Sequence, residues 1–153
     1  MRNFLVSLLF LGLLFSECQA SCFSGKHIEE LISEMTHSSA RQQVALDEVM
    51  LNLNNAAPYL FSYLKDERKL ANRDVRLLNT FAKPSEKYFL TEAYSVGEVV
   101  VKILCDKAMI CDQDFDIYNK GDRDKQIRKL SEWCLQKYGK ETHLCRTSSS
   151  VPP

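Results

Sequence analysis

Three aspartates at alternate positions are the feature of this sequence that most clearly suggests chemistry. Asp112, Asp114 and Asp116 lie within CDQDFDIYNKGD, the stretch that covers residues 111–122. Carboxylates at positions 1, 3 and 5 of a loop supply the first ligands of calcium in an EF-hand. The spacing therefore raises the hypothesis of a calcium site.

The remaining positions of the calcium template do not match. An EF-hand loop needs a glycine at position 6 for a sharp turn and a bidentate glutamate at position 12. Counted from Asp112, Ile117 occupies the glycine position and the cation Arg123 replaces the glutamate. We therefore predict no metal site and no cofactor, with the aspartates facing water. Asp122 is expected to be the N-cap of the last helix, because its side chain can accept hydrogen bonds from free N–H groups at a helix start.

Groupings typical of enzymes are missing from the sequence. His27 and His37 do not have the i, i+4 spacing around a glutamate that zinc hydrolases use, and no Gly-x-Ser-x-Gly motif supplies a serine nucleophile. Cys134, His143 and Cys145 are zinc-type residues, but no Cys-x-x-Cys pair accompanies them. We therefore predict that the protein is not an enzyme.

The amino terminus has the pattern of a secretory signal peptide. Arg2 precedes an apolar run over residues 4–15, and small residues stand at Cys18 and Ala20. This order of a positive, an apolar and a small-residue region is typical of a cleaved signal. The alternative is a membrane anchor, but the run is shorter than the ~20 residues that a membrane-spanning helix needs. We expect a signal peptide at 1–20 and a secreted, extracellular product without stable membrane insertion.

The rest of the chain is predicted to be a single helical domain over residues 21–145, followed by a disordered tail at 146–153. The formal net charge is +0 at pH 7. A neutral chain has no general attraction to nucleic acids or to anionic membranes. The expected partner is therefore an extracellular protein or receptor.

The cysteines predict disulfide bonds outside the cell. Six are encoded, and loss of Cys18 with the signal leaves Cys22 and four others, which are Cys105, Cys111, Cys134 and Cys145. We predict that Cys105 pairs with Cys134 and that Cys111 pairs with Cys145, although four cysteines allow three pairings. Cys22 is then either a free thiol or the bridge of a disulfide-linked homodimer.

Helical spacing of apolar residues runs through the domain. Ser24 is expected to cap a first helix with one apolar stripe, Ile28, Leu31, Ile32 and Met35. A second stripe runs from Leu46 to Ala57, and a last helix is expected over 122–138 with Gly139 after its end.

Two further helices are expected in the middle of the chain. One covers about 59–82, with the mixed charges KDERK at 65–69 on its solvated face. The other begins at Ser85 and covers 85–104, although its VVVKIL run would also suit a buried strand. Gly97 can allow a close approach of a neighbouring helix. Together these elements predict an all-α fold, a small secreted bundle of four to five helices stapled by disulfides near the C-terminus.

Two functions remain open for such a bundle. The first is protein–protein interaction as a signalling ligand, an effector or a venom-like component, with Tyr59, Phe61 and Tyr63 as the candidate surface. A broad core stripe that includes Phe61 is the alternative interpretation of those aromatic residues. The second function is transport of a small apolar ligand in a cavity. The candidate lining of that cavity is Met35, Met50, Phe81, Phe89 and Trp133.

Overall fold

A small β-hairpin interrupts the helices of this protein. The structure is a computed structural model that describes residues 24–79, 87–139 and 145. In chain order its elements are α2 (Gly25–Glu34), α3 (Ser39–Leu51), α4 (Leu53–Leu60), the short 3₁₀ helix η1 (Phe61–Tyr63), β1 (Asp74–Leu78), β2 (Tyr88–Glu92), α5 (Val96–Ala108) and α6 (Lys120–Tyr138). The predicted signal peptide, Cys22 and the predicted tail lie outside the described residues.

The all-α prediction is wrong, because the described residues contain five α-helices and a two-stranded antiparallel sheet. The sheet pairs Asp74 with Glu92 at one end and Leu78 with Tyr88 at the other. On β1, Val75 and Leu77 are buried and their neighbours point outward, which is the period of two of a strand. Ala71, Val75 and Leu78 also have helical spacing. These few apolar residues were therefore interpreted as one face of a helix over 59–82.

The predicted helix over 85–104 is wrong in its first part. Its first part forms β2, and Ser85 lies outside the described residues. Ser95 caps α5 instead, because its side chain accepts a hydrogen bond from the N–H of Glu98 at 3.3 Å. The VVVKIL run is helical, as predicted, and α5 is buried along most of its length. The predicted cap at Ser24 is confirmed, since its side chain accepts from the N–H of His27.

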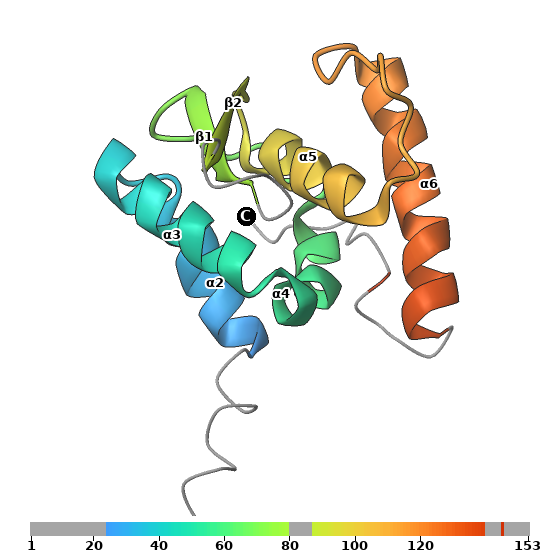
Figure 1. Ribbon diagram of the computed structural model, residues 1–153, viewed down its shortest axis with the longest axis horizontal. Coiled ribbons are helices and arrows are strands. Elements are labelled where there is room, and N and C mark those ends of the chain that lie inside the picture. Colours follow the sequence, from blue (N-terminus) through green and yellow to red (C-terminus); the bar gives the residue numbers. More distant parts are fainter. Residues whose placement is uncertain (1–23, 80–86, 140–144, 146–153) are drawn as a thin grey trace, which may run out of the picture.

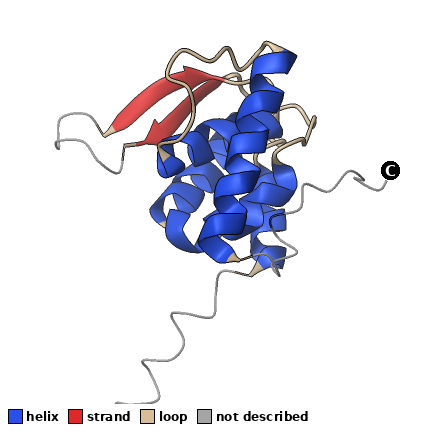
Figure 2. Ribbon diagram, turned by 90° about the vertical axis from the view of Figure 1, so that its right-hand side faces the viewer, coloured by secondary structure: helices blue, strands red, loops and turns tan. Residues whose placement is uncertain are grey.

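The elements surround α5 (Figure 1). In Figure 1, α2 and α3 lie to the left of α5, α4 lies below it and α6 lies to its right. The hairpin packs on α3 through β1, and the quarter-turned view shows it projecting from one end of the helices (Figure 2). The largest fully buried side chains come from most of these elements and form one core. Among them are Ile32, Met35, Leu46, Met50, Phe61, Leu77, Leu104 and Leu130.

The two disulfides correct the predicted pairing. Cys105 is bonded to Cys111, with Cα atoms 5.3 Å apart, and Cys134 is bonded to Cys145, with Cα atoms 5.6 Å apart. All four predicted cysteines are therefore used, but each bond closes a short local loop rather than joining α5 to α6. The reason is that Met109 takes a left-handed conformation after α5 and turns the chain back toward Cys105.

Disulfides of this kind suggest an oxidising, extracellular environment. Across residues 24–79 and 87–139, no helix has the length and apolar character needed to cross a membrane.

Gly97 holds α5 against the loop that follows η1. Its N–H donates to the carbonyl of Asp66 at 2.8 Å. A Cβ atom at this position would lie 2.9 Å from the carbonyl oxygens of both Leu64 and Asp66. The predicted close approach is therefore present, but the neighbour is a loop and not the helix that the sequence led us to expect.

Replacing Gly97 with alanine is expected to destabilise the protein by about 2 kcal/mol, because the two carbonyl oxygens belong to backbone and must move. Gly25→Ala is the matched control. It also lies in the first turn of a helix, and its Cβ would meet only the Tyr59 side chain at 3.4 Å. Urea unfolding of both variants gives the comparison. Equal stability of the two variants would contradict this account of Gly97.

Candidate functional site

The acidic stretch is tied to α6 rather than exposed to water along its length. Lys129 and Lys125 reach the Asp112 carboxylate at 2.6 and 3.0 Å, and Gln126 donates to it at 2.9 Å. These hydrogen bonds hold the pKa of Asp112 well below its usual range, and the bond from Lys129 has the largest effect. The Asp112 side chain is 42% exposed, so it faces water in part as predicted, but it also anchors the loop to α6, which the sequence did not indicate.

The last helix begins earlier than expected. Asn119 is its N-cap, and its side-chain oxygen accepts from the N–H groups of Gly121 and Asp122 at 2.9 and 3.3 Å. Asp122 lies in the first turn instead of capping it. Ile117 is 4% exposed and belongs to the core. Within the part of the chain that the structure describes, no three metal-ligating side chains come together.

The three residues of the predicted aromatic surface differ in how far they are buried. Phe61 is 0% exposed, and its ring stacks on that of Trp133 with centroids 6.1 Å apart. Phe61 is therefore a core residue and the prediction that it forms part of an interaction surface is wrong. Tyr59 and Tyr63 are half-buried against the core, and their role in binding stays a prediction.

The residues proposed to line a carrier cavity mostly fill the core. Met35 and Met50 are 0% and 2% exposed and belong to the buried cluster. Phe89 and Trp133 are half-buried against that cluster, and Phe81 lies outside the described residues. These positions are typical of ordinary packing, so they do not favour the carrier function.

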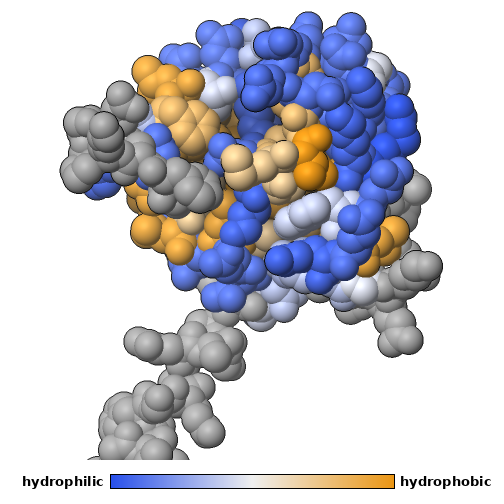
Figure 3. All heavy atoms as spheres, turned by 45° about the vertical axis from the view of Figure 1, so that its right-hand side comes forward, coloured by the Kyte–Doolittle hydropathy of each residue, from blue (hydrophilic) through white to orange (hydrophobic). Residues whose placement is uncertain are grey.

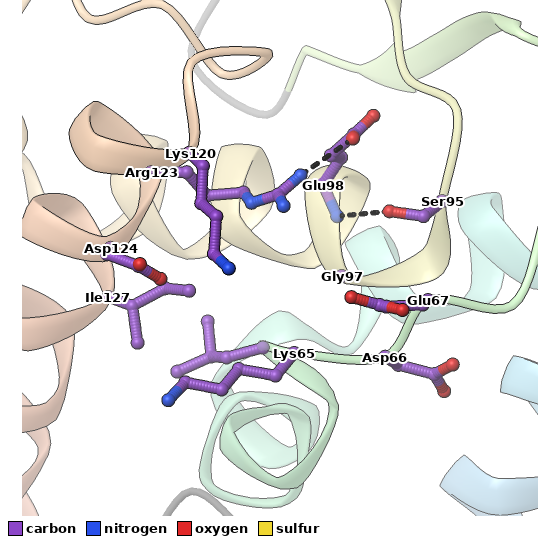
Figure 4. Close-up of a pocket in the computed structure, with 11 residues that line it drawn as sticks. Lys65, Asp66, Glu67, Ser95, Gly97, Glu98, Lys120, Arg123, Asp124 and Ile127 are labelled. Atoms are coloured by element: carbon purple, nitrogen blue, oxygen red, sulfur yellow. Dashed lines mark hydrogen bonds and ion pairs between the residues drawn. The ribbon is translucent and has the colours of Figure 1, made fainter.

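A charged hollow lies where the loop after η1, the start of α5 and the start of α6 meet (Figure 4). Its volume is about 350 Å³. The apolar part of its lining is Leu64, Gly97 and Ile127. Figure 4 shows Lys120 and Asp124 reaching in from α6, opposite Lys65 and Glu67 of the loop. Among the described residues, these four charged side chains form no ion pair and no hydrogen bond.

One wall of the hollow is a buried ion pair. Glu98 is 7% exposed, and Arg123 donates to its carboxylate at 2.8 Å. The other carboxylate oxygen accepts from the N–H of Tyr94 at 2.6 Å. Arg123 therefore fixes the start of α6 to the start of α5, and Glu98 is fully satisfied without a ligand.

The charge run at 65–69 is a structured loop and not the solvated face of a helix, which corrects the prediction. Asp66 is 6% exposed. The Arg68 guanidinium contacts its carboxylate at 2.6 and 3.0 Å, and the Arg68 N–H donates to it at 3.0 Å. Because Asp66 is paired in this way, the loop can present Lys65 and Glu67 to the hollow in a fixed position.

Two tyrosines and an arginine cluster beside this hollow. The Tyr94 and Tyr118 rings meet edge to face with centroids 5.1 Å apart. The Arg73 guanidinium lies 4.5 Å from the centre of the Tyr94 ring. The two tyrosines remain 42% and 46% exposed. Partial burial raises the pKa of Tyr118, and the negative charge of Glu92 is the second cause of the increase. The Tyr118 hydroxyl is therefore a neutral hydrogen-bonding group at neutral pH.

The cluster and the hollow form one surface because Tyr94 and Ser95 connect them. Tyr94 bonds to Glu98 through its N–H, and Ser95 caps the helix whose first turn lines the hollow. We call this combined region, formed by Arg73, Tyr94, Tyr118 and the lining of the hollow, the tyrosine surface. Its members come from three separate segments of the chain, so no local pattern in the sequence indicates it.

The chemistry of the tyrosine surface suits the binding of another protein. It offers aromatic rings, tyrosine hydroxyls, ammonium groups and carboxylates, and its described residues contain no paired nucleophile and base. Figure 3 shows hydrophilic side chains over the top and right of this face, with apolar side chains in its middle and on its left. A partner with mixed polar and apolar side chains would match such a surface.

Comparisons with known proteins give no match: no family model, no curated protein and no solved structure is significantly similar to this chain. The function must therefore be argued from the surface itself.

Proposed function

We propose that this protein is secreted and acts without catalysis, by binding an extracellular protein or receptor through the tyrosine surface. The observation that carries the proposal is the exposed cluster of Arg73, Tyr94 and Tyr118, held by ring contacts at 4.5 and 5.1 Å. Tyrosine and arginine are the residue types enriched at binding hot spots.

Pre-organisation supports the same conclusion. The rings already contact one another, so a partner does not have to immobilise free side chains, and that cost of association falls. The adjacent hollow can receive one side chain of the partner, and its unpaired lysines and carboxylates can recognise either sign of charge. The disulfides agree with an extracellular site of action.

Replacing Tyr94 or Tyr118 with alanine is expected to weaken partner binding at least tenfold, because hot-spot tyrosines contribute about 2 kcal/mol or more. The measurement is binding of the labelled protein to cell surfaces and extracellular proteins from its source, by titration. Unfolding should change by only about 1 kcal/mol, the size of an aromatic pair contact.

The matched control is Leu51→Ala, which removes a side chain that is 71% exposed on α3, outside the tyrosine surface. It should bind like the unchanged protein. If both tyrosine variants bind normally, the proposed surface is wrong. Native mass spectrometry of the secreted protein adds an independent test, since a co-purified apolar molecule would favour the carrier function instead.

A further inference from the structure

The outer edge of β2 is open to backbone hydrogen bonding. In an antiparallel pair, alternate residues direct both backbone groups at the partner strand and the residues between them direct theirs outward. The N–H of Ala93 bonds to the Arg73 carbonyl, and the N–H of Asn79 bonds to the Lys87 carbonyl. The same alternation directs the backbone groups of three β2 residues away from β1, which are Tyr88, Leu90 and Glu92.

The opposite edge of the hairpin is partly occupied. Gln43 of α3 donates to the carbonyl of Arg76 at 3.0 Å, and the N–H of Asp74 is bonded to the Asn72 side chain at 3.1 Å. On β2, by contrast, the outward groups of Tyr88, Leu90 and Glu92 form no hydrogen bond with any described residue. The two edges therefore differ, and the free edge belongs to β2.

The side chains beside the free edge also lack partners. Leu90 is 77% exposed, although leucine is apolar. Asp74 and Glu92 stand directly opposite each other on the outer face of the hairpin. Neither carboxylate has an ion pair among the described residues, and like charges in this position destabilise a sheet. Arg76 is a cation on the same face of the hairpin, opposite Leu90, and a partner that places a second cation opposite Glu92 would reduce the repulsion further.

The free edge leads into the tyrosine surface. A shallow groove on the outer face of the hairpin is lined by Asp74, Arg76, Leu90 and Glu92, among others. The chain continues from Glu92 to Tyr94, and the charge of Glu92 reaches Tyr118. An extended segment lying along β2 would therefore arrive at the two tyrosines.

We propose that β2 is a docking strand, to which an extended segment of the partner protein adds as a third strand. The segment runs antiparallel, with an apolar residue opposite Leu90 and a lysine or arginine opposite Glu92. Main-chain hydrogen bonds to Tyr88, Leu90 and Glu92 supply affinity, as in other cases of strand addition, and the two side-chain pairings supply selectivity. The inference rests on the proposed function and adds the mode of recognition.

A second copy of this chain fits the same edge less well. Two antiparallel β2 strands related by a two-fold axis through Leu90 would pair Glu92 with Tyr88 of the other copy. Glu92 would then have a tyrosine directly opposite it instead of a lysine or an arginine. Charge complementarity therefore favours a basic segment from another protein.

The test uses the synthetic peptide acetyl-Thr-Lys-Thr-Val-Thr-Val-Thr-amide and the isotope-labelled full domain, followed by nuclear magnetic resonance. Adding the peptide is expected to slow amide exchange at Tyr88, Leu90 and Glu92 at least fivefold. A peptide with glutamate in place of lysine should bind at least threefold more weakly. Protection that appears elsewhere, or no binding, would overturn the proposal.

Leu90→Pro is the decisive variant, because it removes an outward N–H that the hairpin itself does not use. Peptide binding should fall at least tenfold, while Leu90→Thr, which keeps the N–H, should stay within about threefold of the unchanged protein. A peptide with an N-methylated central valine tests the same hydrogen bonds without changing the protein. Unchanged binding of that peptide would also overturn strand addition.

The outcomes separate this inference from the proposed function. If Leu90→Pro keeps both peptide and partner binding, strand addition is wrong and the tyrosine surface still stands. If the peptide binds the edge as predicted but Tyr94→Ala keeps full partner binding, strand addition is supported and the proposed surface is wrong. Protection of the same amides at high protein concentration without peptide would indicate a second copy and overturn the choice of partner.

Discussion

Replacing Phe61 with alanine should lower the free energy of unfolding by about 3–5 kcal/mol, the usual cost of emptying the space of a buried phenylalanine. Phe61 is 0% exposed and stacks on Trp133, so its removal leaves a cavity between η1 and α6. Trp133 is the only tryptophan in the sequence, and its fluorescence therefore reports directly on this contact during urea unfolding.

Two further variants serve as controls for the Phe61→Ala result. Phe61→Leu keeps much of the volume and should lose clearly less than the alanine variant. Tyr63→Ala, at a half-buried neighbour, should also lose less. If Phe61→Ala were as stable as the unchanged protein yet failed to bind a partner, Phe61 would be a hot spot after all, and its assignment to the core would be wrong.

Replacing Arg123 with alanine should cost about 3 kcal/mol, because it leaves the buried carboxylate of Glu98 without its cation. The loss comes mainly from that uncompensated charge and not from the contact itself. Chemical unfolding measures the difference in stability, and the position of α6 can be followed by the Tyr94 and Tyr118 resonances.

The matched control for Arg123 is Lys120→Ala. Lys120 also carries a positive charge at the start of α6 and lines the same hollow, but it forms no ion pair among the described residues. Its loss should change stability by less than about 0.5 kcal/mol. The double variant Glu98→Gln, Arg123→Met should recover part of the stability lost in Arg123→Ala, since it removes both charges. Equal losses for Arg123→Ala and Lys120→Ala would refute the buried pair.

Local signals in the sequence predicted local features well. Ser24 at the start of α2 and Gly139 at the end of α6 are confirmed, because each depends only on the few residues next to it. The close approach at Gly97 was predictable because glycine has no side chain to exclude a neighbour.

Features that depend on distant contacts were not predictable in the same way. β1 has only five residues, and its sequence offers Val75 and Leu78 at helical spacing beside the buried strand pair Val75 and Leu77. The disulfide pairing depended on a turn at Met109, and no glycine stands at that position to indicate a turn. The tyrosine surface needs Arg73, Tyr94 and Tyr118 together, and these residues meet only where the segment after β2 contacts the segment before α6.

Site-specific photo-crosslinking tests the proposed binding surface most directly. A photoreactive phenylalanine analogue is placed at position 94, at position 118 or, as a control, at exposed position 51 on α3. We predict that the secreted protein, illuminated with extracellular proteins of its source, forms the same discrete crosslinked product from positions 94 and 118 and none from position 51. A product formed only from position 51, or none from the two tyrosine positions while binding persists, would contradict the proposed surface.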